Sequence, residues 1–388
     1  MSDDDQSQPL TSDSSKHSLN QLPEDPSPER PQKISRVDEE NDAAEEAGND
    51  CNNEIKMHPN PRIQRYLIAI EYIGTRFAGA QQQSNCRTVV GVLEEAFHKF
   101  IGQPVSIFCS SRTDAGVHAL SNVCHVDVER ISKRKPGETL PSHEPAVVRK
   151  AVNHFLQKNE GDIMVIDVRC VPFDFHARYK AQERTYFYRL LSGPEPLSTF
   201  EKDRAWHVTE ELDLLSMQRA CQVLVGCHDF SSFRAAACQA KSPIRTLDEL
   251  NVTEVVSSLH FPSIKEREQS NSLVEDSSAS SLRSESEVSH VSSITCQGKI
   301  DGSNVEPSQI FGMRKSHRCF VVTARARSFL YHQVRLLVGV LKCVGTGELT
   351  VDDVERILKA KTVTAASPMA SACGLYLGHV KYDLPSET

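Results

Sequence analysis

One cluster of chemically capable residues stands out in the chain, the segment Arg112–His118 with the sequence RTDAGVH. A carboxylate on a tight loop can serve as a nucleophile or as a base. Gly116 permits such a loop, and Arg112 is close enough in the chain to keep Asp114 ionised through a charge-assisted pair. An isolated segment of this type is more often an Asx-turn, in which the carboxylate caps backbone N–H groups. A catalytic interpretation therefore needs support from other parts of the chain.

Other catalytic and cofactor motifs are absent from the sequence. It holds no G-x-x-x-x-G-K-[ST] phosphate loop, no G-x-G-x-x-G after an expected strand and no H-E-x-x-H. Four histidines near the candidate segments have spacings that fit no zinc-ligand pattern. They are His118, His125, His176 and His332. The sequence therefore predicts no metal site and no cofactor.

The composition limits the class of protein. A chain of 388 residues, 39% of them hydrophobic, with a mean hydropathy of -0.40, has room for two or three domains. Its apolar runs fall well short of the ~18 residues that span a bilayer, which argues against a transmembrane protein. Its 12 cysteines contain no C-x-x-C pair, and Met1–Asp5 begins neither a signal peptide nor a transit peptide. We expect an intracellular protein with reduced thiols, located in the cytoplasm or nucleus. A mitochondrial location stays an alternative, although no transit peptide is visible.

Charge is distributed unevenly along the chain. Residues 1–62 carry 15 acidic and 6 basic side chains and no aromatic residue, and residues 257–316 carry 17 serines, 8 acids and 6 bases. These compositions predict a disordered acidic tail and a disordered Ser-rich insertion. Removing their net charges of -9 and -2 from the chain total of -8 leaves 266 residues with a net charge of +3. This mildly basic core is compatible with a polyanionic partner.

Hydrophobic periodicity predicts the elements that must position the candidate loop. The expected strands cover 63–72, 106–110, 123–128, 163–171, 184–191, 247–256, 319–325 and 374–380. The expected helices cover 88–101, with Thr88 as N-cap, and 146–156, 212–225, 329–343 and 351–359. Strands and helices mixed in this way, with few tight strand–helix–strand units, favour an α+β fold with two similar lobes. The Asp114 loop then connects two strands.

Further short blocks follow the RTDAGVH segment in a fixed order. They are FDFHAR at 173–178, RTYFY at 184–188, SFR at 232–234, FLYHQVR at 329–335 and GLYL at 374–377. With these blocks the chain resembles the TruA-like family of tRNA pseudouridine synthases, over about residues 65–383. The two serines before Arg112 and the ALSN stretch at 119–122 resemble most the eukaryotic branch called tRNA pseudouridine synthase-like proteins.

The resemblance implies a fold and an assembly. The expected fold is α+β, with two RRM-like lobes joined into one extended, mostly antiparallel sheet flanked by helices, and a catalytic cleft between the lobes. The N-terminal lobe would cover 63–190 and carry the Asp114 loop, and the C-terminal lobe would cover 191–383 with the insertion at 257–316. The implied partners are tRNA and a second copy in a homodimer, with no membrane and no nucleotide cofactor.

The resemblance also implies roles for individual residues. In the family, the residue matching Asp114 is the essential nucleophile, the one matching Tyr186 stacks on the target uracil, and the one matching Arg335 pairs with the carboxylate. The other expected substrate-binding residues are Arg112, Arg184, His118 and Leu375. The implied reaction isomerises uridine to pseudouridine in the anticodon stem-loop of tRNA, without redox change or cofactor. Whether Asp114 acts as nucleophile or as base at the sugar stays open.

Packing offers a simpler interpretation for several of these residues. Tyr186 shares an alternating strand with Tyr188, where cross-strand packing is common. Arg335 lies on an apolar helix, where a lone arginine usually reaches solvent or an ion pair. Five basic residues are candidates for phosphate contacts, although a solvated basic face explains them equally well. They are Arg178, Lys180, Arg184, Arg325 and Arg327.

Two other functions compete with the synthase interpretation. The first is a non-catalytic RNA-binding or RNA-chaperone protein that retains the synthase fold. Asp114, Tyr186 and Arg335 together argue against it, because a pure binder needs no carboxylate facing a polyanion. The second is an unrelated metabolic α+β enzyme that uses Asp114 with His118. This enzyme would show no RNA affinity, so a salt-dependent gel shift separates it from the others.

Two positions depart from the family pattern. A G-W-Q stretch usually follows the first strand, and here residues 79–83 read GAQQQ. A glycine usually precedes the arginine of the R-T-D block, and here Ser111 takes its place. We expect both positions on the pocket side of the first lobe, where they affect which RNA is accepted.

Overall fold

The computed structural model describes residues 62–384, apart from 133, 136, 137, 139, 160, 256–316 and 367. Nearly all of the predicted acidic tail and the whole predicted Ser-rich insertion lie outside the described residues. Within the described ranges, no helix combines the length and the apolar character that a bilayer span requires.

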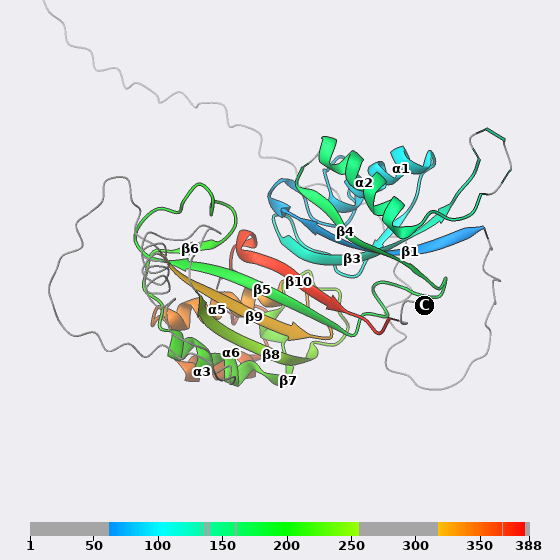
Figure 1. The fold of residues 1–388 in the computed structure, drawn as a ribbon. Helices are drawn as coiled ribbons and strands as arrows, with labels where there is room; N and C mark the ends of the chain where they lie inside the picture. The colour runs from blue at the N-terminus through cyan, green and yellow to red at the C-terminus, as the bar shows by residue number, and fades with distance from the viewer. Residues whose placement is uncertain are drawn as a thin grey trace, which may run out of the picture. The chain divides into compact units, whose positions relative to one another are not determined.

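Ten strands of the described chain form one sheet (Figure 1). They are β1 (Ile63–Tyr72), β2 (Ile107–Cys109), β3 (His118–Glu129), β4 (Ile163–Val171), β5 (Glu183–Ser192), β6 (Trp206–Val208), β7 (Gly226–Asp229), β8 (Ile244–Val255), β9 (Arg318–Ala326) and β10 (Leu375–Lys381). Their order is β4-β1-β3-β10-β5-β9-β8-β7, with β2 paired to β3 and β6 paired to β5. All pairs are antiparallel except β10 with β3 and β5 with β6.

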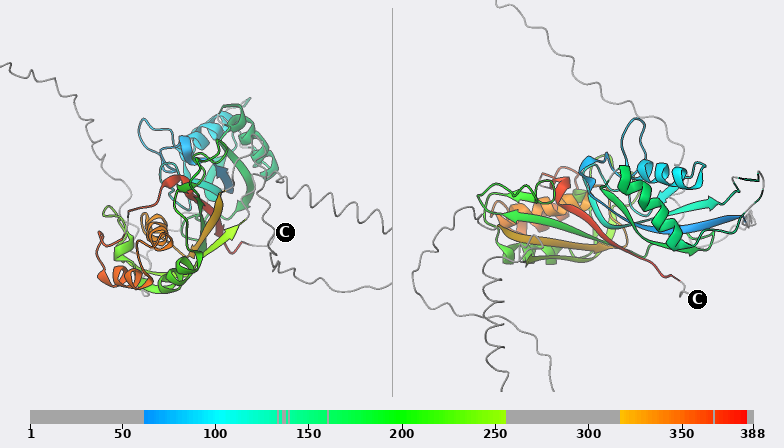
Figure 2. Two further views of the ribbon diagram at one scale, coloured as in Figure 1. Left: turned by 90° about the vertical axis from the view of Figure 1, so that its left-hand side faces the viewer. Right: turned by 45° about the horizontal axis from the view of Figure 1, so that its top comes forward.

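Five α-helices of the described residues flank the sheet. They are α1 (Val89–Ile101), α2 (Pro145–Asn159), α3 (Leu214–Leu224), α5 (Gln333–Gly345) and α6 (Val351–Ala360). Helices α1 and α2 pack with the strands β1 to β4, whereas α3, α5 and α6 pack with β5, β8 and β9 (Figures 1 and 2). The predicted α+β fold with one large, mostly antiparallel sheet is confirmed.

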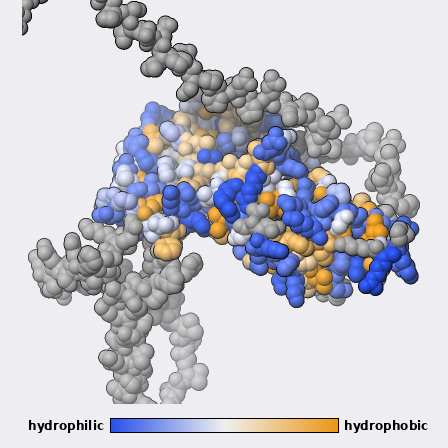
Figure 3. Space-filling view, turned by 90° about the horizontal axis from the view of Figure 1, so that it is seen from above, coloured by the Kyte–Doolittle hydropathy of each residue, from blue (hydrophilic) through white to orange (hydrophobic). Residues whose placement is uncertain are grey.

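Two hydrophobic cores lie between the helices and the sheet. The first holds the apolar side chains of β1 to β4, α1 and α2, and the second holds those of β5, β8, β9, α3, α5 and α6. Strand β10 contributes to both, because Leu377 belongs to the first core and Leu375 to the second. Outside the cores, hydrophilic side chains surround smaller hydrophobic areas on the face shown in Figure 3. The predicted lobe boundary between residues 190 and 191 stays a prediction.

Local sequence signals explain where several elements begin and end. Thr88 is the N-cap of α1, as predicted, and its hydroxyl accepts a hydrogen bond from the Gly91 N–H at 3.2 Å. Gly102 ends this helix with a φ of 89°, in the left-handed region that glycine adopts without strain. Thr350 and Asp353 form a capping box at the start of α6. These short-range bonds satisfy backbone groups at the helix ends and explain why the helices begin and end at these residues.

The structure corrects the predicted elements at four places, one of which is β3, since this strand begins at His118 and the prediction begins at residue 123. Strands β6 and β7 are absent from the prediction, since three or four residues are too few to show an alternation. The helix predicted over 329–343 begins only at Gln333. Residue His332 precedes it with a φ of 63°, a left-handed conformation that an α-helix cannot contain. The residues from Phe329 to His332 therefore form an irregular segment, and this segment belongs to the candidate site.

A buried histidine in β3 links stability to pH. Burial, together with the nearby charge of Arg65, lowers the pKa of His125 to about 4. The unfolded chain then binds a proton near pH 6.5 that the folded chain takes up only near pH 4, so stability falls as the pH falls through this window. We expect a loss on the order of 2 kcal/mol in the free energy of unfolding from this residue. Urea unfolding at pH 7 and pH 5 measures it, and His125→Asn should reduce the wild-type difference by about this amount, while the other buried histidines keep their share.

Candidate active site

The candidate active-site loop connects β2 to β3 and is held by its own backbone. The N–H of Ser110 donates to the Val123 carbonyl at 2.7 Å, which keeps the start of the loop on β3. The N–H of Val117 donates to the Asp114 carbonyl at 3.2 Å and closes a turn. Gly116 sits inside this turn with a φ of 77°, a conformation that favours glycine. The turn presents the Asp114 side chain, which is 23% exposed.

A buried polar network supports the loop from below. The hydroxyl groups of Tyr72 and Thr113 lie 2.8 Å apart, and the Asn122 amide donates to the Tyr72 hydroxyl and to the Ser111 carbonyl, each at 3.2 Å. The Ser110 hydroxyl donates to the Asn122 side-chain carbonyl at 3.0 Å. Burial raises the pKa of the Tyr72 hydroxyl well above its ordinary value, so this group stays a neutral partner. A fully bonded network of this type fixes the loop in one conformation.

The segment that departs from the family pattern packs directly on the loop. The N–H of Ala80 donates to the Thr113 carbonyl at 3.0 Å. A Cβ atom on Gly79 would lie 3.0 Å from the same carbonyl oxygen, and Gly79 has a φ of 113°. Only glycine fits there without moving the loop. The expectation that this stretch lies beside the pocket is therefore supported for its first two residues.

A guanidinium and an imidazole meet the Asp114 carboxylate from the start of α5. Arg335 Nη1 lies 3.5 Å from Asp114 Oδ2, and His332 Nε2 lies 3.2 Å from the same oxygen. Arg335 is only 12% exposed, and its Nε donates to the Ala370 carbonyl at 2.9 Å, which fixes the guanidinium. The structure thus brings together Asp114 and Arg335, which lie 221 positions apart in the chain.

His332 is a site residue that the sequence interpretation considered only as a metal ligand. Its left-handed backbone turns the imidazole toward Asp114, and its ring stacks on Tyr331 with centroids 3.7 Å apart. A non-glycine residue in this conformation costs energy and often marks a functional position. The sequence did contain a signal, because His332 and Arg335 are three residues apart at a predicted helix start, where side chains lie on one face.

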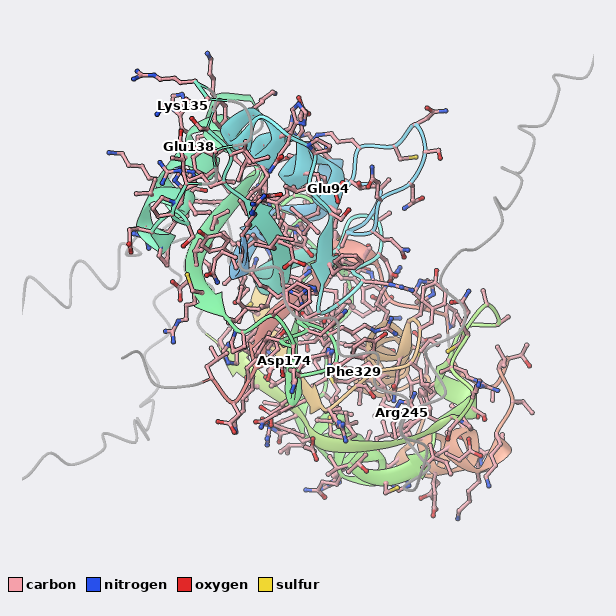
Figure 4. The ribbon with its side chains drawn as sticks, turned by 90° about the vertical axis from the view of Figure 1, so that its right-hand side faces the viewer. Glu94, Lys135, Glu138, Asp174, Arg245 and Phe329 are labelled. Carbon is pink, nitrogen blue, oxygen red and sulfur yellow. The ribbon has the colours of Figure 1, made fainter. Side chains whose placement is uncertain are left out.

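Tyr186 stands in β5 between the two hydrophobic cores and packs against both. The ring of Phe329 meets it edge-on, with centroids 5.2 Å apart and an interplanar angle of 89°. Burial raises the pKa of the Tyr186 hydroxyl above its ordinary value, and the charge of Asp114 acts in the same direction. Phe329, labelled in Figure 4, is a second site residue that the sequence did not reveal. It holds the Tyr186 ring in place close to the carboxylate.

Arg184 binds the protein rather than solvent. Its guanidinium donates to the carbonyls of Arg327 at 2.5 Å, Ser110 at 3.1 Å and Arg178 at 3.1 Å, and to the Ser111 hydroxyl at 3.2 Å. Burial lowers the pKa of this guanidinium from its ordinary value. Arg184 therefore joins the Asp114 loop to the segments before β5 and after β9. We therefore interpret Arg184 as a residue that positions the Asp114 loop. Its bonds inside the protein do not support the expected direct contact with substrate.

Replacing Arg184 should destabilise the protein strongly. The change Arg184→Ala removes the donor from two partly buried carbonyls and one exposed carbonyl, at a cost of about 1–3 kcal/mol in the free energy of unfolding. Arg318→Ala is the matched control, since Arg318 is an exposed arginine whose ion pair with Glu254 should contribute less than about 1 kcal/mol. Chemical denaturation of the two variants measures both values. An equal loss of unfolding free energy in the two variants would show that the Arg184 hydrogen bonds contribute little to stability.

Within the described residues, neither His118 nor Arg112 has a hydrogen bond or ion pair with the Asp114 carboxylate. His118 is buried, its Nδ1 accepts from the Gly74 N–H at 3.0 Å, and its Nε2 donates to the carbonyls of Asp203 and Cys373. Leu375 is buried in the second core. Arg112 is exposed, and within the described residues its side chain forms no ion pair with Asp114, in contrast to the expectation. With both nitrogens bonded inside the protein, His118 fits a structural role.

The basic residues predicted to contact phosphate differ in their surroundings, and Lys180 is one that lies near an acid, 3.8 Å from Asp174. Arg325 forms ion pairs with Glu183 at 2.9 Å and Glu249 at 3.0 Å, so acidic side chains already balance its charge. The guanidinium groups of Arg178 and Arg327 lie close enough to Arg184 to act on its pKa. With exposed Arg112 next to Ser111, they place positive charge around the Asp114 loop. In the described part of the chain, no three His, Cys, Asp or Glu side chains are grouped so that they could hold a metal ion.

Comparison with known proteins agrees with this geometry. A sequence profile described as tRNA pseudouridine synthase matches residues 68–180 and 220–383. The chain is 37% identical over 320 residues to tRNA pseudouridine synthase A of Rhodospirillum centenum, which covers 82% of this chain and all of the relative. It is 36% identical to the protein of that name from Xanthobacter autotrophicus over 320 residues, again 82% of this chain and all of the relative. The same identity extends over 324 residues of the Rhodospirillum rubrum protein, 84% of this chain and 89% of the relative. The chain therefore belongs to the tRNA pseudouridine synthase family.

Proposed function

We propose that this protein isomerises uridine to pseudouridine in the anticodon stem-loop of tRNA, with Asp114 as the nucleophile. Membership of the family makes it a tRNA pseudouridine synthase, an isomerase. The proposal adds the position in the RNA and the residue that reacts. One observation carries it: Asp114 is a carboxylate that is 23% exposed, and its Oδ2 lies 3.5 Å from Arg335 Nη1 and 3.2 Å from His332 Nε2. The exposed part of the side chain is open to substrate.

The reaction needs a carboxylate of this kind. In the nucleophilic route, an Asp114 oxygen attacks C1′ of the ribose and the C1′–N1 bond breaks. The uracil then turns so that C5 attacks C1′ and displaces the carboxylate. C5 loses its proton and N1 gains one, so the overall change is an isomerisation that needs no oxidant or reductant. Arg335 and His332 stabilise the carboxylate both before the attack and when it is released.

The position of Tyr186 fits a role at the target base. A uridine in a folded RNA must leave its stack before its C1′ can be reached. An aromatic face compensates for the lost stacking by about 1–3 kcal/mol per base. Tyr186 stays un-ionised at neutral pH, and Phe329 holds its ring in one orientation. We infer that the uracil stacks on Tyr186 while Asp114 reacts.

The assembly and the site of action form part of the proposal. We infer a homodimer in which one tRNA contacts both subunits, in an intracellular compartment. Arg112, Arg178 and Arg327 would contact phosphates next to the target uridine. We also infer that the protein belongs to the eukaryotic branch that the ALSN stretch at 119–122 resembles.

Release of tritium from C5 tests the anticodon position. A tRNA transcript labelled with [5-³H]uridine loses tritium only when C5 forms its new bond. We expect release from such a transcript, and none from a matched transcript in which cytidine replaces every uridine of the anticodon arm. Equal release from both transcripts would place the reaction elsewhere in the tRNA. Release from neither, together with tight binding, would favour an RNA-binding protein that retains the synthase fold.

A further inference from the structure

A row of four aromatic rings lies next to the active-site loop and is not used by the proposed reaction. Phe108 is 51% exposed and Tyr179 is 49% exposed. Between them, Phe108 stacks on His125 with centroids 5.3 Å apart, His125 meets His176 at 4.6 Å, and His176 meets Tyr179 at 4.3 Å. We call these four residues the ring row. Two large aromatic side chains, each about half exposed, lie at the two ends of this row, and an exposed aromatic surface of this kind often binds a ligand.

The ring row lies on the sheet face that α1 and α2 leave uncovered. Ile107 packs in the first core with side chains of α1, and its N–H donates to Glu94 of α1 at 2.9 Å. Phe108 is the next residue in β2, so its side chain points to the opposite face. His125 is the direct partner of Phe108 in the β2–β3 pair and shares that face.

The ring row is held rigidly before any ligand binds. His125 is buried, and its Nδ1 accepts a hydrogen bond from the Ala177 N–H at 3.2 Å. This bond ties the middle of the row to the chain segment that carries His176 and Tyr179. A rigid aromatic surface binds a flat ligand at a small cost in conformational entropy. Burial lowers the pKa of His176 as well as that of His125, so both inner rings are neutral at pH 7.

A cationic side chain lies beside one end of the ring row. The Arg178 guanidinium lies 5.9 Å from the Tyr179 ring centroid. Two other basic side chains near the row pair with acids: Arg65 forms two bonds with Asp127, and Lys180 lies 3.8 Å from Asp174. An exposed ring beside an arginine matches an unstacked base on a phosphate backbone.

The ring row is also connected to the active site. Arg184 donates to the carbonyl of Ser110, two residues after Phe108, and to the carbonyl of Arg178, one residue before Tyr179. The same guanidinium holds the Ser111 hydroxyl at the base of the Asp114 loop. The label of Asp174 in Figure 4 marks the segment between β4 and β5 that carries this part of the row. A nucleotide bound to the ring row would therefore be held at a fixed position relative to Asp114.

We infer that Phe108 and Tyr179 form a stacking platform for an unpaired base of the substrate RNA, a base other than the target uridine. This inference rests on the proposed function, since it takes the ligand to be tRNA. The platform would hold the loop that contains the target and set which uridine reaches Asp114. It would contribute to binding equally before and during the reaction, so its loss should raise KM with little effect on kcat.

Alanine and conservative substitutions at the exposed rings test the platform. We expect Phe108→Ala and Tyr179→Ala each to raise the Kd for an unmodified tRNA transcript about 5- to 100-fold at fixed salt, with kcat within about 3-fold of wild type. Phe108→Tyr keeps an aromatic face and should restore binding. Phe200→Ala is the control, since Phe200 is 77% exposed and lies outside the ring row. Fluorescence anisotropy gives Kd, and thermal melting establishes that each variant is folded.

The outcomes separate this inference from the proposed function. Wild-type turnover with unchanged Kd in both alanine variants would overturn the platform and leave the proposed function standing. Loss of affinity in the variants, with no turnover by wild type, would support the platform and overturn the function. A change in sedimentation mass without a change in Kd would assign the rings to an interface between two copies and overturn the platform. A wild type that does not bind tRNA would overturn both.

Discussion

Asp114→Asn should lower the single-turnover rate of pseudouridine formation by about 10⁴-fold or more, while tRNA binding stays at least as tight. The amide keeps the shape of the carboxylate and loses the charge that attacks C1′. It also removes a negative charge that faces a polyanion, with Arg335 and His332 left in place. The rate of tritium release from [5-³H]uridine-labelled tRNA measures the loss, and anisotropy measures binding.

A second substitution guards this result against a chemical artefact. An asparagine can deamidate to aspartate and restore some activity, whereas Asp114→Ala cannot. Both variants should therefore be inactive and should melt within a few degrees of wild type. Turnover above about 1% of wild type in Asp114→Ala would contradict a nucleophilic carboxylate at this position.

Arg335→Gln should lower kcat by about 10²- to 10³-fold and change KM for tRNA by less than about 3-fold. Arg335 is largely buried, and its guanidinium is fixed by the Ala370 carbonyl 2.9 Å from Nε. It stabilises the Asp114 carboxylate at the moment the uracil leaves or returns, an interaction that is strongest in the transition state. Steady-state kinetics on one tRNA separates kcat from KM.

Two further variants show whether charge or geometry matters at Arg335. Arg335→Lys keeps the positive charge but cannot reproduce the fork that reaches both Ala370 and Asp114, so its kcat should lie between those of wild type and Arg335→Gln. Arg318→Gln is the matched control on β9, where the arginine pairs with Glu254, and it should leave kcat unchanged. A rise in KM alone in Arg335→Gln would assign Arg335 to RNA binding.

Local patterns predicted most of the fold. Strand β1 and strand β4 begin and end where the alternation of apolar residues begins and ends. Helix α1 begins after its predicted N-cap Thr88. The sequence predicted no pairing of distant strands, because register depends on tertiary contacts. The parallel pair of β10 with β3, which brings residues 376–377 against 118–119, is an arrangement of this kind.

The candidate site was predictable in part. The order of short blocks pointed to Asp114, Tyr186 and Arg335, and the structure brings Arg335 to Asp114. Residue type alone did not distinguish a substrate-binding arginine from a structural one. Arg184 and His118 both carry groups suited to RNA, yet the folded chain bonds both of them internally. The burial of a polar side chain decides whether it can reach a substrate. The spacing of residues in the sequence does not predict that burial.

His332 and Phe329 were missed for a related reason. The apolar periodicity of residues 329–343 predicts a continuous helix, in which His332 would be one more polar position. The left-handed φ of 63° at His332 breaks this pattern and turns the imidazole toward Asp114. A backbone conformation imposed by tertiary contacts overrides local propensity. The edge-on contact of Phe329 with Tyr186 has the same origin.

Mapping pseudouridine on a pool of unmodified tRNA tests the central claim most directly. Carbodiimide-dependent stops of reverse transcription locate each pseudouridine, and wild type is compared with Asp114→Asn on the same pool. We predict stops at uridines of the anticodon arm with wild type and none with Asp114→Asn, although both proteins bind the tRNA. Stops that persist in the variant, or wild-type protein that binds tRNA and produces none, would contradict the account.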